Sequence, residues 1–248
     1  MHKFCVICAA MACVLFASFA CAVPLTQENG VFPASAEIHK RVCDNIRVEP
    51  YYNDLELDIG ISSAAVSGDG EVAIISKSSK GGCDFIISEY LPDGTFKRGY
   101  KIDYDVLKGR TQLFYSDEGD LCYLCSYRAE VAGKVKYPDV VVVFGDAGIQ
   151  KSYEVPDIDG FFIENMSDAG SAEIYVSPTS RYRIEKLDKA YLSIADTDTG
   201  AVYEIYNQTE AYDEYFGVVR RNKNIYFAIC ACMLVLFAVY ILRRNKGH

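Results

Sequence analysis

Two closely spaced cysteines are the first residues whose types and spacing suggest chemistry. Cys122 and Cys125 form a C-x-x-C pair, a spacing used for thiol–disulfide exchange and for zinc binding. This pair lies in a run that is typical of a β-strand, where residues three apart point to opposite faces. A redox pair begins a helix and a zinc knuckle occupies a turn, so we expect two small core residues here. A disulfide such as Cys43–Cys83 is an open alternative, because a secreted domain permits one; zinc is another.

Two aspartate-rich stretches partly resemble calcium loops. They are Asp196-Thr-Asp198-Thr-Gly200 and Asp157-Ile-Asp159-Gly160. An EF-hand requires further oxygen ligands and a glutamate at its twelfth position, and neither stretch has that pattern. We therefore expect hairpin turns in both places. The sequence predicts no metal site and no cofactor.

Hydrolytic machinery is scarce in the sequence. His39 is the one histidine outside the terminal segments, so any Ser-His-Asp or Cys-His site depends on it. It stands beside Lys40 and Arg41, which predicts a solvated surface. No nucleophile-elbow, phosphate-loop or zinc-protease motif occurs. Carboxylates are plentiful, so a glycosidase remains an alternative, but no spacing selects two of them and we name no catalytic residue.

The charge of the chain is unevenly distributed. All 34 acidic residues and 18 of the 25 basic residues fall between Leu25 and Gly217, which gives this body a net charge of −16. Such a body repels nucleic acid and anionic lipid, so we expect no nucleic-acid partner. Its roughly two hundred residues suffice for one sizeable hydrophobic core.

The first 22 residues resemble a secretory signal peptide. Lys3 precedes the apolar run Phe4–Phe19, and the small residues of Ser18-Phe19-Ala20 or of Ala20-Cys21-Ala22 suit signal peptidase. The alternatives are an uncleaved signal anchor and a lipidated Cys21. A cleaved signal places the following residues on the extracytoplasmic side.

An uncharged stretch near the other end predicts a membrane anchor. Ile225–Leu242 holds eighteen residues without a charge and has basic residues on both sides. As a helix it would be about 27 Å long, close to the thickness of the hydrocarbon layer of a bilayer. A buried core helix is the alternative. The predicted organisation is a signal peptide at 1–22, an N-terminal segment at 23–54, an extracytoplasmic β-repeat domain at 55–217, a transmembrane helix at 225–242 and a cytoplasmic tail at 243–248.

The body contains three similar stretches. Each has an apolar run, a serine, an acidic turn that ends in glycine and a second apolar run, at Ala64–Ser76, Leu113–Cys125 and Ile163–Ser177. A further turn follows in each unit, within Phe85–Phe96, Val140–Gln150 and Tyr191–Tyr203. The turn glycines recur at intervals of 49 to 54 residues: Gly70, Gly119 and Gly170 in the first turns, and Gly94, Gly148 and Gly200 in the second. Each unit thus predicts two hairpins, or four strands.

The strands of these hairpins differ in polarity. Leu121–Cys125 and Val140–Phe144 are apolar on both faces, so we expect both faces to be covered. Thr95–Ile102, Ile149–Val155 and Ala201–Tyr206 mix apolar with charged residues, as outer strands do. The sequence therefore predicts a mainly β fold of repeated four-stranded antiparallel units, propeller-like or a β-sandwich, plus one C-terminal transmembrane helix.

The first unit resembles a known repeat. Its Ser67-Gly-Asp-Gly70 turn, strand Glu71–Ser76, strand Phe85–Tyr90 and Pro92-Asp-Gly-Thr95 turn are similar to the WD40-like repeat of TolB-type β-propellers. The resemblance extends over roughly residues 59–207 and implies a surface that binds a partner. Closed propellers use four or more blades, whereas this chain offers three. An open stack, a β-sandwich and a partial ring completed by a second copy all stay open.

These features together predict a membrane-anchored extracytoplasmic module that binds or scaffolds a protein or a surface glycan. Open strand edges add the expectation of a homo-oligomer. A membrane-bound hydrolase that uses acidic residues is one alternative. An accessory subunit of a membrane complex, held through residues 225–242, is another.

Overall fold

The computed structural model describes residues 25, 30–49, 58–78, 85–103, 107–131, 133–145, 148–156, 163, 166–169 and 172–245. The chain divides into two units, Met1–Asn207 and Gln208–His248. Several predictions fall outside the described residues: the signal peptide, Cys83, Asp157–Gly160 and Gly170.

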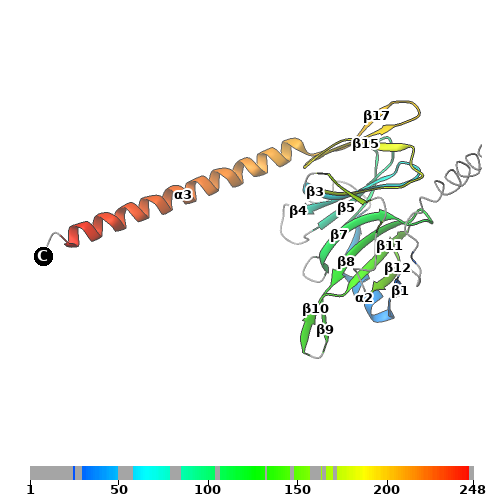
Figure 1. Ribbon diagram of the computed structural model, residues 1–248, viewed down its shortest axis with the longest axis horizontal. Coiled ribbons are helices and arrows are strands. Elements are labelled where there is room, and N and C mark those ends of the chain that lie inside the picture. Colours follow the sequence, from blue (N-terminus) through cyan, green and yellow to red (C-terminus); the bar gives the residue numbers. More distant parts are fainter. Residues whose placement is uncertain are drawn as a thin grey trace, which may run out of the picture. The chain divides into compact units, whose positions relative to one another are not determined.

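Strands dominate the first unit (Figure 1). They are β1 (Phe32–Pro33), β2 (Ile46–Glu49), β3 (Asp58–Val66), β4 (Val72–Ser78), β5 (Phe85–Tyr90), β6 (Phe96–Ile102), β7 (Leu107–Tyr115), β8 (Leu121–Tyr127), β9 (Ala129–Val131), β10 (Lys134–Lys136), β11 (Asp139–Gly145), β12 (Gly148–Val155), β13 (Met166–Ala169), β14 (Ala172–Val176), β15 (Tyr182–Asp188), β16 (Tyr191–Asp196) and β17 (Val202–Asn207). The helices are α2 (Ala36–Asn45) in this unit and α3 (Thr209–Asn245) in the second.

The described strands form three main sheets and a small hairpin. A seven-stranded sheet has the order β13-β14-β3-β4-β5-β6-β2, a five-stranded sheet the order β1-β12-β11-β8-β7, and a three-stranded sheet the order β15-β16-β17. β9 and β10 pair only with each other. The fold is therefore mainly β, with antiparallel pairing except between β14 and β3.

Alternating side chains of the seven-stranded sheet supply two separate cores. Ala73 and Ile75 of β4 join the core shared with the five-stranded sheet. Their neighbours Val72 and Ile74 join a second core with Leu192 and other residues of the three-stranded sheet. Because successive strand residues point to opposite faces, one sheet can serve two cores. The seven-stranded sheet thus lies between the other two, and the three sheets form layers.

The first two repeats fold as predicted. β3–β6 and β7–β8 with β11–β12 are four-stranded antiparallel meanders. β8 is buried along its whole length, as its two-sided apolar character predicted, and β6, β12 and β17 are partly exposed. Gly70, Gly94, Gly119, Gly148 and Gly200 all have positive φ.

The prediction of a third four-stranded unit is wrong. β13 and β14 leave their unit and extend the seven-stranded sheet, where Glu173–Val176 of β14 pair in parallel with Ser63–Val66 of β3. The ladder continues into the next turn, since the backbone N–H of Ser177 donates to the carbonyl oxygen of Val66 at 2.8 Å. β16 and β17 gain β15 instead, which the sequence analysis did not predict. With the third blade divided, the described strands form no closed ring, and the arrangement is a layered sandwich.

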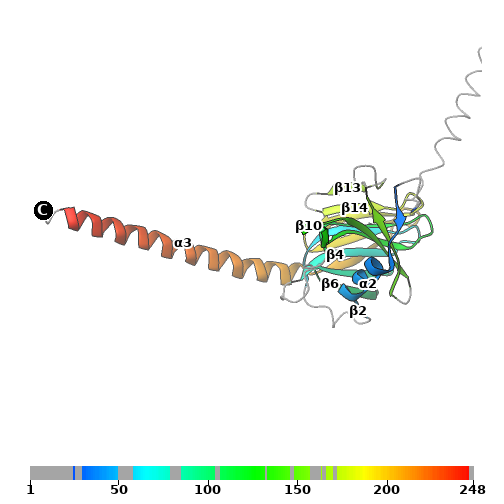
Figure 2. The same cartoon turned by 90° about the horizontal axis from the view of Figure 1, so that it is seen from below.

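One helix in the first unit was also not predicted. α2 begins after Ser35, whose side chain accepts a hydrogen bond from the backbone N–H of Ile38, and this is a typical N-cap. It is short and has few apolar residues, with Val42 alone fully buried among its described side chains. Figure 2 shows α2 beside β2, and it also contacts β12.

A single continuous helix makes up nearly all of the described part of the second unit. α3 begins at Thr209, so it includes residues 209–217, which the sequence analysis assigned to the β-repeat domain, and it continues through residues 225–242. Its side chains are described as far as Leu234. Within the described part of the chain, no helix combines the length and the apolar character that crossing a membrane requires.

Candidate functional site

Three serine turns from different parts of the chain meet at one end of the layered sheets. The first, Ser67–Glu71, joins β3 to β4; the second, Ser116–Asp120, joins β7 to β8; the third, Ser177–Ser180, joins β14 to β15. The first two have the same bonding, in which the serine Oγ accepts the backbone N–H four residues later, at 2.9 Å from Glu71 and 3.2 Å from Asp120. Since the sequence repeat includes these serines, the repeat encodes the turn geometry itself.

Glycines allow the first and third turns to approach closely. A Cβ atom on Gly68 would lie 2.7 Å from Oγ1 of Thr179, and one on Gly70 would lie 2.3 Å from the ring of Tyr182. Gly70 also has a φ of 86°, a conformation that residues with a Cβ rarely adopt. The Ser-Gly-Asp-Gly sequence is therefore required for the turn and for the contact across it.

The three turns surround a hollow of about 480 Å³, which we call the three-turn recess. Its acidic lining residues are Asp69, Glu71, Asp117 and Glu118; its hydroxyl-bearing ones include Ser67, Ser177 and Thr179. Glu71 is bonded to Lys97, whose Nζ lies 2.8 Å from Oε2 of the carboxylate. The recess is therefore open, polar and rich in negative charge.

A buried ion pair lies in the adjoining part of the first core. The side chains of Glu89 and Arg98 are 2% and 12% exposed, and Nε of Arg98 donates to Oε2 of Glu89. Tyr100 donates its hydroxyl to the same oxygen at 3.2 Å, and Nη1 of Arg98 donates to the carbonyl oxygen of Gly145 at 2.7 Å. The pair thus connects β5 and β6 of the seven-stranded sheet to β11 of the five-stranded sheet. A charged pair this far from water needs such additional hydrogen bonds.

A cavity of about 160 Å³ opens beside this ion pair, and we call it the Tyr115 cavity. Its lining includes Tyr115, Phe144 and Gln150 as well as both ion pairs, Lys97–Glu71 and Arg98–Glu89. It shares Glu71, Tyr115 and Gly119 with the three-turn recess. The two spaces therefore adjoin.

The hydroxyl group of Tyr115 has no hydrogen-bond partner among the residues that the structure describes. The residue is 2% exposed, and its hydroxyl oxygen forms no hydrogen bond within the described part of the chain. Its backbone is fixed by Tyr175, whose hydroxyl donates to the carbonyl oxygen of Tyr115 at 3.0 Å. Burial, followed by the charges of Glu89 and Glu71, raises the pKa of Tyr115 well above that of a free phenol. The group therefore stays protonated at neutral pH.

The chain matches no known protein family, no curated protein and no solved structure. The resemblance to TolB-type repeats consequently rests on the turn sequences alone. The structure forms two of the three predicted four-stranded units.

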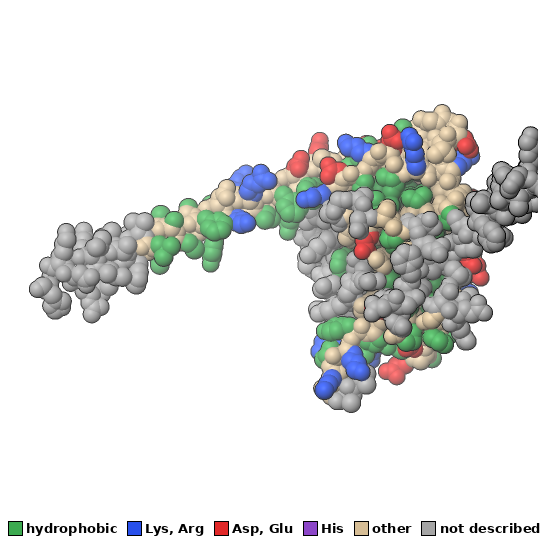
Figure 3. All heavy atoms as spheres, viewed as in Figure 1, with side chains coloured by type: hydrophobic (Ala, Val, Ile, Leu, Met, Phe, Trp, Pro, Cys, Tyr) green, Lys and Arg blue, Asp and Glu red, His purple; other side chains and the backbone are tan. Residues whose placement is uncertain are grey.

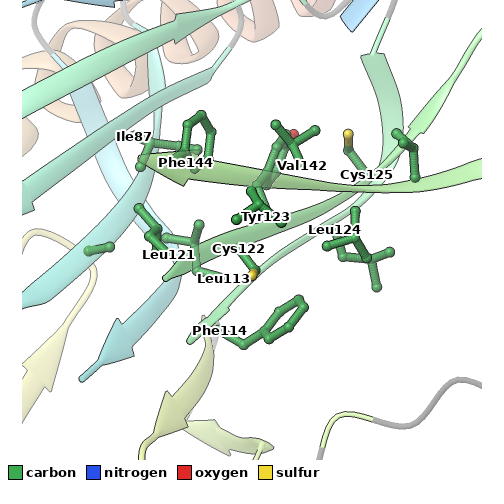
Figure 4. Packing of buried hydrophobic residues seen from close by; sticks show 14 of the residues in the cluster. Ile87, Leu113, Phe114, Leu121, Cys122, Tyr123, Leu124, Cys125, Val142 and Phe144 are labelled. Atoms are coloured by element: carbon green, nitrogen blue, oxygen red, sulfur yellow. The ribbon is translucent and has the colours of Figure 1, made fainter. Parts of the chain in front are cut away.

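The C-x-x-C cysteines lie in the core. In Figure 4 the sulfur atoms of Cys122 and Cys125 lie on opposite sides of β8, and both side chains are fully buried without a disulfide. Burial raises the pKa of each thiol far above its usual range. Two separated, protonated thiols neither exchange disulfides nor share a metal, so the expectation of core residues is confirmed.

His39 is half-buried rather than fully solvated. Its Nδ1 lies 3.0 Å from Oγ of Ser152 in β12, and its Nε2 lies 3.7 Å from the sulfur of Cys43, one turn along α2. A cysteine nucleophile requires a lowered pKa, whereas burial raises that of Cys43. This group therefore ties α2 to the five-stranded sheet.

The Asp196 stretch forms the predicted hairpin turn. Oδ1 of Asp196 accepts the backbone N–H groups of Asp198 at 2.9 Å and Thr199 at 3.4 Å. The carboxylate is thus used by its own turn. No group of three or more potential metal ligands occurs in the described part of the chain.

Sequence reasoning did not identify Glu89, Arg98 or Tyr115. One signal was present for Glu89, since it is the one charged residue in the otherwise uncharged strand Phe85–Tyr90. A charge at a buried strand position requires a partner. The partner and the unpaired hydroxyl of Tyr115 follow from the packing of two sheets, which no local pattern records.

Proposed function

We propose that the chain is a membrane-anchored extracytoplasmic module that binds a protein or a surface glycan at the three-turn recess. The observation that carries this proposal is the convergence of three turns around one open hollow, although more than one hundred residues separate Ser67 from Ser177. Loops that a rigid scaffold holds together are the usual place for recognition.

The charges of the recess favour some partners over others. Four carboxylates line it, and Lys97 offsets one of them. A partner that presents cationic or hydroxyl groups suits this lining, whereas nucleic acid would be repelled, as it would be by the body as a whole. The recess is therefore proposed to hold a basic side chain of a protein or the hydroxyl groups of a glycan.

The exposed side chains of α3 support the proposed anchor. Ile225, Tyr226 and Phe227 are 52%, 71% and 63% exposed, and Figure 3 shows hydrophobic side chains along the described part of this helix. Consecutive helix residues lie about 100° apart, so these three side chains point to different sides of the helix. The apolar run of the sequence continues to Leu242, past the last described side chain. A lipid environment for Ile225–Leu242 would cover this surface.

Strand edges give a route to self-association. β15 and β17 are the outer strands of the three-stranded sheet as described, and Val202 at the start of β17 is 58% exposed. Backbone groups of an open edge can pair with a strand of another chain.

Binding is favoured over hydrolysis by the state of the carboxylates. A glycosidase needs one carboxylic acid that donates a proton and a second carboxylate that acts as base or nucleophile. The carboxylates of Glu71 and Glu89 in the Tyr115 cavity are each bonded to a cationic side chain. Each carboxylate would therefore have to leave its ion pair before it could act on a substrate.

Site-specific photo-crosslinking in native membranes tests the recess. A photoreactive amino acid at Asp69 or Asp117 should yield a defined crosslinked partner. The same amino acid at Glu185, an exposed position on β15, should not. Identical crosslinks from all three positions would contradict the proposal. It would also be contradicted if neither recess position gave a crosslink and the protein turned over a glycan or peptide.

Protease treatment of intact cells tests the location. External protease should digest the first unit and leave a short membrane-bound fragment that contains Ile225–Leu242. Complete protection of the first unit would contradict the extracytoplasmic location.

A further inference from the structure

We propose that the β9–β10 hairpin of one copy of the chain docks into the three-turn recess of a second copy, head to tail. This inference rests on the binding function proposed above and names the partner as another molecule of the same chain. It follows from the exposure and charge of the hairpin, the charge of the recess, and the positions of the two surfaces in the fold.

The β9–β10 hairpin projects from the first unit. Among the described strands, β9 and β10 pair only with each other. The base of the hairpin is held by the backbone N–H of Tyr127, which donates to the carbonyl oxygen of Pro138 at 2.9 Å. Nη1 of Arg41 in α2 also donates to the carbonyl oxygen of Arg128 at 2.9 Å. Figure 1 shows the hairpin extending beyond the other strands at one end of the unit.

The hairpin is basic, unlike the body that carries it. Residues 128–137 include Arg128, Lys134 and Lys136 against the single acidic residue Glu130, a net charge of +2, whereas the body carries −16. The side chains of all four charged residues are exposed. None of the three basic residues forms an ion pair within the described part of the chain. The hairpin therefore offers unpaired cations to an anionic partner.

Two large apolar side chains lie next to these cations. Val135 and Tyr137 are 46% and 48% exposed. Aromatic residues beside cationic ones are common in protein–protein interfaces and rarer on the remaining surface of a protein. The composition of the hairpin thus favours a protein partner.

The three-turn recess has the complementary charge. The side chains of Asp69, Asp117 and Glu118 in its lining are exposed, and they form no ion pair within the described part of the chain. The hollow of about 480 Å³ is open and can take the ends of lysine side chains. The two acidic bodies repel each other as wholes, but salt screens that repulsion over about 8 Å at physiological ionic strength, so ion pairs in direct contact can still form.

The hairpin and the recess lie at opposite ends of β8. This strand begins directly after the Ser116–Asp120 turn, which lines the recess, and it ends at Tyr127, directly before the hairpin. Its seven residues span about 23 Å. The hairpin therefore does not reach the recess of its own chain. A contact between two copies leaves one hairpin and one recess free, so the association continues into a ring or a chain of copies.

Sedimentation velocity tests the association. The sample is the full chain, one copy in each nanodisc of uncharged phosphatidylcholine, at about 0.15 M salt. Exposed ion pairs are individually weak, so the wild type should associate with a Kd of roughly 10–1,000 μM. Confinement to one membrane would raise the effective concentration of copies above this range. A wild type that stays monomeric at about 1 mM would overturn the inference.

Reversing the charges on each surface shows which surfaces meet. Lys134→Glu/Lys136→Glu should raise the Kd about tenfold or more, and so should Asp69→Lys/Asp117→Lys. An equimolar mixture of the two variants should associate again, because each reversed hairpin then meets a reversed recess. Pairing at the edges of β15 or β17 would not produce this pattern. Loss in both variants without recovery in the mixture would overturn the inference if both variants keep the wild-type near-ultraviolet circular dichroism.

A matched control separates the hairpin from the overall charge. Lys186→Glu/Lys189→Glu changes the net charge by the same amount at two exposed positions of the three-stranded sheet and the turn within it. This variant should associate as the wild type does. An equal loss of association in the control and in Lys134→Glu/Lys136→Glu would overturn the inference.

Photo-crosslinking with otherwise unchanged surfaces locates the contact. A photoreactive amino acid at Tyr137, in a mixture of isotope-labelled and unlabelled chains, should join the hairpin of one copy to Ser67–Glu71 or Ser116–Asp120 of another. Crosslinks only to other segments would overturn the inference. So would binding of the hairpin lysines to phosphatidylserine vesicles without association of copies, which would make an anionic lipid surface the partner.

The crosslinks from the recess in native membranes separate this inference from the function on which it rests. A defined partner of Asp117 that is a different protein, together with a monomeric wild type, would overturn the inference alone and leave the proposed binding function standing. The absence of any partner of the recess, in membranes and in nanodiscs, would remove both.

Discussion

Replacing Gly94 and Gly119 by alanine separates the cost of a positive φ from the cost of a steric clash, because Gly94 combines the two and Gly119 does not. The two glycines occupy equivalent hairpin turns, with φ values of 84° and 87° and hydrogen bonds from their N–H groups to a carbonyl three residues earlier. They differ in their surroundings. A Cβ atom on Gly94 would lie 2.5 Å from the backbone carbonyl oxygen of Glu204 in β17, whereas one on Gly119 would meet nothing within 4 Å.

The expected loss of stability follows from this difference. A left-handed conformation costs a residue with a Cβ about 1–2 kcal/mol, and both variants incur that cost. Gly94→Ala must also push the β5–β6 turn away from the backbone of β17, and overpacking of this kind adds about 1–3 kcal/mol. We therefore expect the free energy of unfolding to fall by about 1–2 kcal/mol for Gly119→Ala and by about 2–5 kcal/mol for Gly94→Ala.

Urea unfolding of the full chain, followed by near-ultraviolet circular dichroism of its 19 tyrosines, measures both values. For a chain of this size each 1 kcal/mol also lowers Tm by about 2–4 °C, so thermal melts give an independent check. Equal losses in the two variants would show that the β5–β6 turn does not rest on β17. That result would refute the packing of the three-stranded sheet described above.

Three further predictions concern buried groups. Arg98→Met leaves the carboxylate of Glu89 buried without its cation and should lower the free energy of unfolding by about 3–5 kcal/mol. The double change Glu89→Leu/Arg98→Met should recover much of this loss. Equal losses for the single and the double variant in urea unfolding would contradict the ion pair. Burial raises the pKa of Cys122 and Cys125, so iodoacetamide at about pH 8 should modify these thiols only in unfolded protein. Mass spectrometry that finds them modified in folded protein would contradict their place in the core. The backbone donors of its turn lower the pKa of Asp196. The stabilising effect of this carboxylate is therefore present above the ordinary aspartate pKa and is lost as the pH falls through the lowered pKa. Asp196→Asn should make the free energy of unfolding less dependent on pH below about pH 4, and an unchanged pH dependence in this range would contradict the turn.

Local sequence patterns predicted the hairpins well because their causes are local. The Asp-Gly turns need positive φ, and the structure has it at Gly94 and Gly200. Burial on both faces of β8 follows equally from its uninterrupted apolar run. Strand–turn–strand units can therefore be predicted from composition and spacing alone.

Assembly of the hairpins was less predictable. The edge of β3 could pair with any free strand, and β14 took that position although its sequence resembles the corresponding strands of the other repeats. The choice depends on packing across sheets, such as the bond from Tyr175 to Tyr115 and the approach of Thr179 to Gly68. The candidate site was missed for the same reason, since Glu89 and Tyr115 acquire their environments only when the sheets meet.

The parallel pairing of β14 with β3 has a consequence for the order in which the chain can fold. Ser63 pairs with Glu173, about 110 residues later in the sequence. During synthesis the two four-stranded meanders, which end at Val155, are complete before β14 exists. At the synthesis rate of about 5–20 residues per second, the edge of β3 therefore stays open for several seconds or more. In that interval the nascent chain presents an unpaired strand on which a chaperone, or a neighbouring nascent chain, could pair, and closure of this edge by β14 ends the exposure.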